Sequence, residues 1–170
     1  MATLFVDKVD PQSGTSLEIG SSGDTITIPS GATITNSGTD TGFGGANTPA
    51  FSTRLNSAQN IANNTFVKIT FDGELFDTDS AFASNKFTVP SGEGGNYFFN
   101  YGIQYLAYAA NRGISSFRKN GSEIQTSEIS PLTASTNPTI TGALSLNLSA
   151  GDYVEVFVYQ NSGSAQDIRG

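Results

Sequence analysis

The sequence predicts an all-β protein, a jelly-roll β-sandwich preceded by a short β-rich oligomeric stem. The chain has 19 Gly among its 170 residues, with abundant Ser, Thr and Asn, a composition that favours many turns between short strands. No window of ten or more residues keeps the apolar period of about 3.6 that a helix requires. The aromatic C-terminal part instead shows seven or more short alternating runs, which is typical of a sandwich or jelly roll.

Aromatic residues divide the chain into two parts. Of twelve Phe and six Tyr, only Phe5 and Phe43 precede residue 50. The sequence therefore predicts an N-terminal stem or attachment segment over residues 1–40, a Gly-rich linker over 41–49, and a jelly-roll head over 50–170.

The stem contains brief apolar pairs separated by glycines at turn positions. Such pairs bury too little surface to offset a backbone ordering cost of about 1–2 kcal/mol per residue. A disordered leader is one interpretation, but the repeat of paired β-branched residues favours several chains wrapped around one axis. The residues expected at this contact between subunits are Leu17, Ile19, Ile26, Ile28 and Ile34.

The head begins with four short elements. Phe51 to Leu55 is a first strand, and Phe66 to Phe71 alternates apolar and polar residues. Asp72-Gly73 is expected to turn the chain into Glu74-Leu75-Phe76. Pro90 ends a separate short strand, Phe87-Thr88-Val89.

The central strand lies in the stretch from Lys86 to Ala110, the longest run of strand-forming residues. From Tyr97 to Ala109 every odd position is apolar or aromatic, which predicts a face that packs on the core. The even face is half apolar, although a two-layer sandwich covers only one face of each sheet. We therefore expect three even-face residues to contact another subunit: Phe98, Leu106 and Tyr108.

Four further strands follow, the first two of which form a hairpin. Asn120-Gly121 is the strongest local hairpin signal, because both positions of a type I′ turn need positive φ. Ile140 to Leu148 places three leucines on one face, and Tyr153 to Tyr159 places three valines on one face.

Charge argues against several classes of partner. Eight Lys and Arg against fifteen Asp and Glu give a net charge of -7, which opposes binding to nucleic acid and to anionic membrane surfaces. The chain has no Cys, so no disulfide is expected. No secretion signal is recognised at the N-terminus, and no segment reaches the roughly 18 apolar residues of a membrane span, so membrane insertion is not expected.

Catalysis is not expected, because the chain lacks both His and Cys. The one dense acidic cluster is formed by Asp72, Glu74, Asp77 and Asp79. Glu74, Asp77 and Asp79 leave open a paired-carboxylate hydrolase. All four residues together leave open a Ca²⁺ site, but their spacing does not match an EF-hand loop. We favour ordinary surface charge, and predict no cofactor and no tightly bound metal.

Two features could serve a binding head. Aromatic residues near strand ends, Tyr105, Tyr108 and Phe117, could stack on sugars, although aromatics in sandwich strands more often belong to the core. Asn111-Arg112-Gly113 is a candidate exposed tip, and loop tips often carry binding function. These three residues are the receptor-loop candidates.

Several motifs of the head resemble a known family. Phe87-Thr88-Val89-Pro90, then Gly95-Asn96-Tyr97-Phe98-Phe99, and later Gly151-Asp152-Tyr153-Val154 are similar to the globular head of the first complement component and of tumour necrosis factor. The resemblance covers roughly residues 50–163. The stem from Phe5 to Thr35, with its phrases Val6 to Gly14 and Ser22 to Ile34, resembles shaft segments of virion proteins from tailed phages of marine cyanobacteria.

The resemblance implies a jelly roll that forms a tight homotrimer, with the long aromatic strand in the sheet facing the threefold axis. The family also ends in an apolar strand between the first strand and the long one. The sequence reaches Gly170 without a matching strand, so we expect a gap there.

The implied function is that of a virion structural protein, a trimeric fibre or surface spike of the particle. Its N-terminal segment would attach to other virion proteins, and its head would bind a host cell-surface glycan or protein. The alternatives are a capsid or tail decoration protein without receptor binding, and a bacterial adhesin, which the lack of a recognised signal peptide disfavours.

Overall fold

The computed structural model describes residues 8–35, 37, 48–106, 112–129 and 137–169. The chain divides into two compact units, Met1–Phe43 and Gly44–Gly170, and the division falls inside the predicted linker. None of the described residues belongs to a helix of the length and apolarity that crossing a membrane requires.

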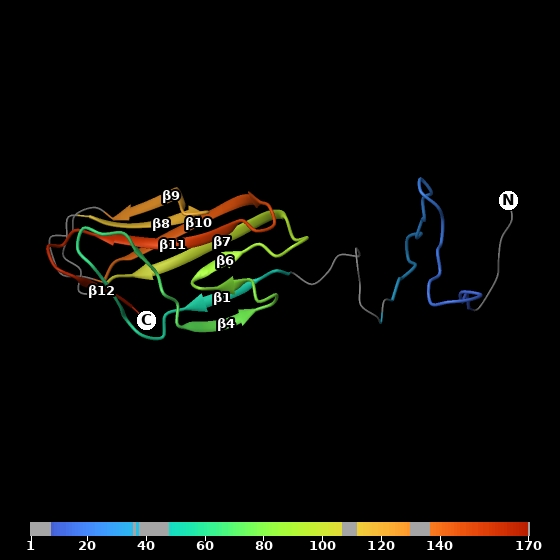
Figure 1. The fold of residues 1–170 in the computed structure, drawn as a ribbon, viewed down its shortest axis with the longest axis horizontal. Helices are drawn as coiled ribbons and strands as arrows, with labels where there is room; N and C mark the ends of the chain where they lie inside the picture. Colours follow the sequence, from blue (N-terminus) through green and yellow to red (C-terminus); the bar gives the residue numbers. More distant parts are fainter. Residues whose placement is uncertain (1–7, 36, 38–47, 107–111, 130–136, 170) are drawn as a thin grey trace. The chain divides into compact units, whose positions relative to one another are not determined.

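The described residues of the N-terminal unit contain turns but no strand (Figure 1). The expected β-rich stem is therefore not seen in residues 8–35 of the single chain, because a strand needs a neighbour to receive its backbone hydrogen bonds. All five predicted contact residues expose much of their side chains: Leu17 43%, Ile19 67%, Ile26 59%, Ile28 48% and Ile34 55%. A stem built from several chains stays a prediction.

The head is a series of short strands. In chain order these are β1 (Phe51–Arg54), β2 (Gln59–Ile61), β3 (Val67–Lys68), β4 (Gly73–Asp77), β5 (Phe82–Ala83), β6 (Lys86–Thr88), β7 (Gly95–Gln104), β8 (Gly113–Lys119), β9 (Ser122–Ile129), β10 (Thr139–Leu148), β11 (Tyr153–Gln160) and β12 (Gln166–Ile168).

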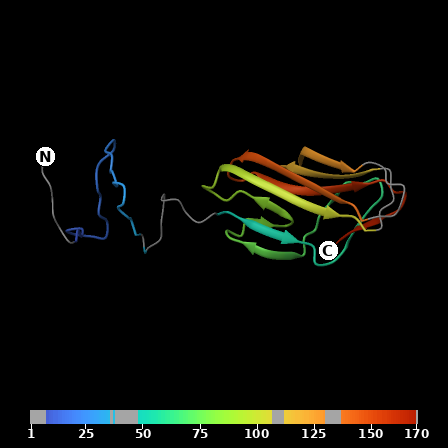
Figure 2. The same ribbon diagram turned by 180° about the vertical axis from the view of Figure 1, so that it is seen from behind.

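These strands form two layers. The larger sheet has the order β5-β6-β11-β8-β9, with β3 beside one end of β11. The other layer contains the pairs β10-β7, β1-β4 and β12-β2 (Figures 1 and 2). The pairings between these strands are antiparallel, and the head is an all-β jelly-roll sandwich, as the sequence predicts.

The core lies between the layers and confirms the predicted alternation. Phe99 and Ile103 of β7 are buried, as are Val154 and Val158 of β11. One core cluster is built around Ile61, Ile69, Ile103, Tyr105, Ile140, Val158 and Ile168. A second is built around Ala81, Phe87, Val89, Phe99, Phe117, Leu148 and Val154.

Tyr101 joins the two layers. Its hydroxyl lies 2.8 Å from the Ser115 hydroxyl of β8, and burial raises the pKa of Tyr101. The ring lies across Gly142, its register partner on β10, where a Cβ would come within 2.4 Å of a ring carbon. Position 142 therefore has no room for a side chain while the ring keeps this position.

The predicted hairpin is confirmed. Asn120 has φ 51° and Gly121 has φ 81°, and Lys119 pairs with Ser122 across the turn. Both φ values are positive, as a type I′ turn requires.

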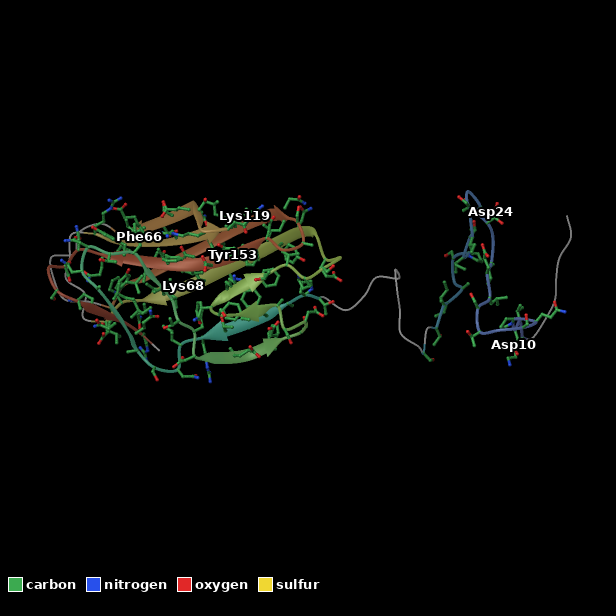
Figure 3. All side chains as sticks on the ribbon, viewed as in Figure 1. Asp10, Asp24, Phe66, Lys68, Lys119 and Tyr153 are labelled. Carbon is green, nitrogen blue, oxygen red and sulfur yellow. The ribbon has the colours of Figure 1, made fainter. Side chains whose placement is uncertain are left out.

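Asp152 fixes this hairpin to the next turn of the chain. It accepts hydrogen bonds from the Asn120 amide at 2.7 Å and from the Ser149 N–H at 2.9 Å, and it pairs with Lys119 at 2.8 Å. Asn120 in turn accepts from the N–H of Tyr153, which lies beside Lys119 at this end of the head (Figure 3). Hydrogen bonds from Lys119, Asn120 and the Ser149 N–H lower the pKa of Asp152 to about 2.

Two elements of the structure differ from those that the sequence predicts. Asp72-Gly73 does not join neighbouring strands of a hairpin, because β3 pairs with β11 while β4 pairs with β1. The central strand ends at Gln104 rather than Ala109, and residues 107–111 lie outside the described part. β3 and β4 each pair with a strand that is not their neighbour in sequence, and local patterns do not identify such a partner.

Candidate binding surfaces

The outer face of the β7-β10 pair carries one large apolar side chain on a polar surface. Phe98 is 67% exposed and stands opposite Ser145 of β10. Nearby, the Asn147 amide donates to the Asn96 side chain at 3.0 Å. The other exposed residues of this face are small or polar: Asn100, Gly102, Thr141 and Ala143. The face is therefore suited to contact with another molecule.

The other predicted contact residues of the head are only partly described. Leu106 is half-buried, and its N–H donates to the carbonyl of Asp167 at 2.8 Å. Tyr108 lies outside the described residues. Contact between subunits at Phe98, Leu106 and Tyr108 stays a prediction.

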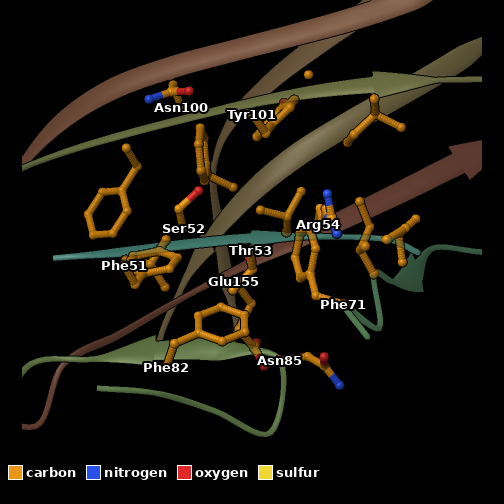
Figure 4. Close-up of a pocket in the computed structure, with 18 of the residues that line it drawn as sticks. Phe51, Ser52, Thr53, Arg54, Phe71, Phe82, Asn85, Asn100, Tyr101 and Glu155 are labelled. Atoms are coloured by element: carbon orange, nitrogen blue, oxygen red, sulfur yellow. The ribbon is translucent and has the colours of Figure 1, made fainter. Parts of the chain in front are cut away.

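A groove separates β1 from β7 (Figure 4). Its cavity volume is about 490 Å³. One wall is formed by Phe51, Ser52 and Thr53, and the other includes Asn100 and Tyr101. The remaining lining includes apolar side chains of both layers: Ile69, Phe71, Phe82, Phe117 and Val156.

The short strand β12 closes one end of this groove. Ile168 forms a bridge with Tyr105, and the Arg169 N–H donates to the Gln104 carbonyl at 2.8 Å. On its other side β12 pairs with β2. The expectation that the closing strand is missing is therefore wrong at this end, where Gln166–Ile168 occupies the expected position. A gap remains where the groove continues along β7.

Backbone groups of β7 point into the groove. The Tyr105 N–H donates to the Pro138 carbonyl on the β10 side, whereas the Gln104 carbonyl accepts from Arg169 on the other side. Hydrogen-bonding direction alternates along an antiparallel strand, so residues 98, 100 and 102 direct their N–H and C=O groups away from β10. Among the described residues, no strand pairs with this stretch of the β7 edge.

The acidic cluster is not gathered into one site. Asp77 accepts from the N–H groups of Ala81 and Phe82, both at 2.9 Å. Asp72 accepts from the Asn56 N–H, which lowers the pKa of Asp72. Within the described residues no group of three or more His, Cys, Asp or Glu could hold a metal ion.

The other two residues of the acidic cluster are Glu74 and Asp79. Glu74 is exposed on β4, and Asp79 accepts from the Thr78 hydroxyl at 3.2 Å. Asp77 and Asp79 thus form hydrogen bonds with residues close in sequence, whereas Asp72 accepts from Asn56, sixteen residues away.

The candidate receptor tip is partly held in place. The Arg112 guanidinium donates to both carboxylate oxygens of Glu128, at 2.7 and 2.9 Å, and this contact raises the pKa of Arg112. Gly113 is buried at the start of β8, and Asn111 lies outside the described residues.

Two of the aromatic candidates for sugar stacking belong to the core. Tyr105 is 0% exposed and Phe117 is 2% exposed, so neither can serve as a platform for a ligand. The groove was missed at the sequence level, because it depends on which distant strands pair. Its one sequence signal is the expected gap beside the long aromatic strand.

No protein-family model matches the chain, and no curated protein matches it. Among solved structures, the chain is similar to the globular domain of zebrafish complement 1qA protein, with 17% sequence identity and a TM-score of 0.45. The match covers 66% of this chain and 92% of that domain. At this identity the likeness concerns the fold alone, and the strand order described above is what establishes the all-β sandwich.

Proposed function

We propose that the protein is a trimeric virion surface component, a fibre or spike, whose head binds a host surface. The observation that carries this proposal is the exposed Phe98 on the outer face of β7-β10. A capsid or tail decoration role is the second candidate.

The exposed Phe98 on the outer face of β7-β10 is the first argument for assembly. Burying one Phe side chain is worth about 1.5–3 kcal/mol, and Phe98 stands exposed, with no further layer of the described head covering it. In a cyclic oligomer the same residue of every copy lies at the same distance from the axis. A threefold arrangement with the outer face of β7-β10 turned towards the axis would thus bring three Phe98 side chains into one contact.

The N-terminal residues support the same assembly. Ile19, Ile26 and Ile34 are each more than half exposed, and they belong to neither core cluster of the described residues. Their similarity to shaft segments of phage virion proteins supports a place on the particle. The head would then be the part that reaches the host.

The oligomeric state tests the first half of the proposal. Light scattering on the full chain should give about three times the 17.8 kDa chain mass. Phe98→Asp should lower this mass, because it places unpaired charge in the contact. Ile124→Asp on β9 is the matched control, since Ile124 is also exposed, at 40%, but lies on the other sheet. A monodisperse monomer at micromolar concentration would contradict the trimer.

The binding partner tests the second half of the proposal, namely that the head binds a host surface. The purified chain should retain host envelope or whole host cells in a pull-down. Retention of capsid or tail alone would instead establish the decoration role.

A further inference from the structure

We propose that the groove between β1 and β7 receives a β-strand from a second copy of this chain, formed by residues Thr25 to Ile28. The inference rests on the proposed function only in requiring more than one copy. It assigns an occupant to the gap between these two strand edges.

The groove needs a strand because its walls are strand edges. β1 pairs with β4 on one side, and no strand in the described part of the head pairs with its other edge. Residues 98, 100 and 102 of β7 direct backbone N–H and C=O groups into the same gap. A peptide strand can satisfy both edges at once, as in recognition by strand addition.

The length and direction of the occupant are also defined. Arg169 already occupies the position opposite Gln104, so the open stretch of β7 runs from Phe98 to Gly102. At roughly 3.4 Å per residue this stretch accepts a strand of about five residues. The strand would continue the line of β12 and run antiparallel to β7.

The groove selects an alternating sequence. In a strand at this place, every second side chain faces the apolar lining formed by Ile69, Phe71 and Val156. The intervening side chains lie on the outer face beside Asn100 and Gly102, where the surface is polar and open. Apolar and polar residues must therefore alternate.

Thr25-Ile26-Thr27-Ile28 meets this requirement. Ile26 and Ile28 are 59% and 48% exposed, and the two threonines would take the outward positions. The nearest backbone hydrogen bonds are Asp24 N–H to Ser21 and Ala32 N–H to Pro29, and residues 25–28 take part in none with the described residues. Pro29, which lacks an N–H, would end the added strand.

Charge favours the same direction. Running antiparallel to β7, the segment would place Asp24 at the end of the groove lined by Arg54 and Arg169. Neither arginine forms an ion pair with another described residue. An aspartate there would meet unpaired positive charge.

Disulfide trapping tests the proposal, and the natural absence of Cys makes the background clean. One full-length chain carries Thr27→Cys, and a second carries Phe98→Cys, Asn100→Cys or Gly102→Cys. Directly opposed residues of an antiparallel pair lie about 5.5 Å apart at Cα, within the range that a disulfide bridges. One of the three pairs should form a mixed dimer roughly tenfold or more faster than a control pair with Thr126→Cys on β9.

A second variant shows whether the isoleucines direct the pairing. Ile26→Ser with Ile28→Ser should remove the preference for β7, while Leu17→Ser with Ile19→Ser should leave it unchanged. Equal rates for β7 and the β9 control would overturn the proposal. So would a disulfide that forms only when both cysteines are on the same chain.

The result is separable from that of the proposed function. A chain that scatters as a trimer without preferential trapping at β7 keeps the trimeric spike and removes strand exchange. Preferential trapping in a dimer or an open series of copies keeps strand exchange and removes the trimer.

Discussion

Residues 8–35 and the head contain similar β-branched residues, but they bury them to very different degrees. Ile26 exposes 59% of its side chain, whereas Ile61 and Ile69 of the head expose 0% and 1%. Both regions have alternating apolar residues and glycine turns. The difference lies in the aromatic residues and in a second layer, which only the head has. An alternating pattern therefore predicts that a segment can form a strand. Whether its apolar side chains are buried depends on whether a second layer covers them.

The shortest strands of the head make the same point. β3 has two residues, and it forms because Val67 and Lys68 pair with Val158 and Phe157 of β11. The four residues from Thr25 to Ile28 have stronger alternation and form no strand within the described chain. Whether a segment forms a strand therefore depends on whether another strand is available to pair with it.

The largest expected effect comes from removing an aromatic residue that the second layer covers. Phe87 is 1% exposed, and its ring packs on Phe51 and Phe99 with distances between ring centroids of 5.1 and 5.4 Å. Phe87→Ala should lower the free energy of unfolding by about 3–5 kcal/mol in urea titrations, because it leaves a cavity. Phe98→Ala is the control. Comparable losses from the two substitutions would show that exposure does not separate these positions.

An intermediate effect is expected at Asp152, whose pKa of about 2 is below the ordinary aspartate value of 3.8. A lowered pKa in the folded state means that the stabilisation is complete above pH 3.8 and is lost as the pH falls towards 2. Asp152→Asn should lower Tm at pH 7 and flatten the fall in Tm between these two pH values. Glu123→Gln, at an exposed position of β9, should leave the profile unchanged. Identical acid profiles for Asp152→Asn and the natural chain would contradict this role.

The smallest effect is expected in the N-terminal unit. Ile19→Ser should change the free energy of unfolding of the head by less than about 0.5 kcal/mol, because Ile19 is 67% exposed. If several stems pack together, the same substitution should lower the mass measured by light scattering. A large loss of head stability would show that the two regions are not independent.

Local signals predicted much of the head. The Asn120-Gly121 turn was correct because positive φ at both positions is a property of those two residues. The inward faces of β7, β10 and β11 were correct because alternation is visible in one strand at a time. Phe98 was recognised as an even-face residue for the same reason.

Pairing between distant strands could not be predicted. The Asp72-Gly73 pair resembles a hairpin turn, yet the strands on its two sides belong to different layers. β12 was overlooked because Gln166–Ile168 carries one buried apolar residue, and only its place between β2 and Tyr105 makes it a strand. The groove between β1 and β7 depends on these long-range pairings, so local sequence patterns could not predict it.

The pairing of β2 with β12 has a consequence for how the head folds. Asn60 and Asp167 are joined by a hydrogen bond across 107 residues. Loop closure of this length costs chain entropy before any contact repays it, and proteins dominated by such contacts fold in roughly milliseconds to seconds. On a ribosome that adds about 5–20 residues per second, β2 would emerge many seconds before its partner. The exposed edge of β2 must stay unpaired by β12 through that interval, so the closure of the head at this edge waits until Gln166–Ile168 has emerged.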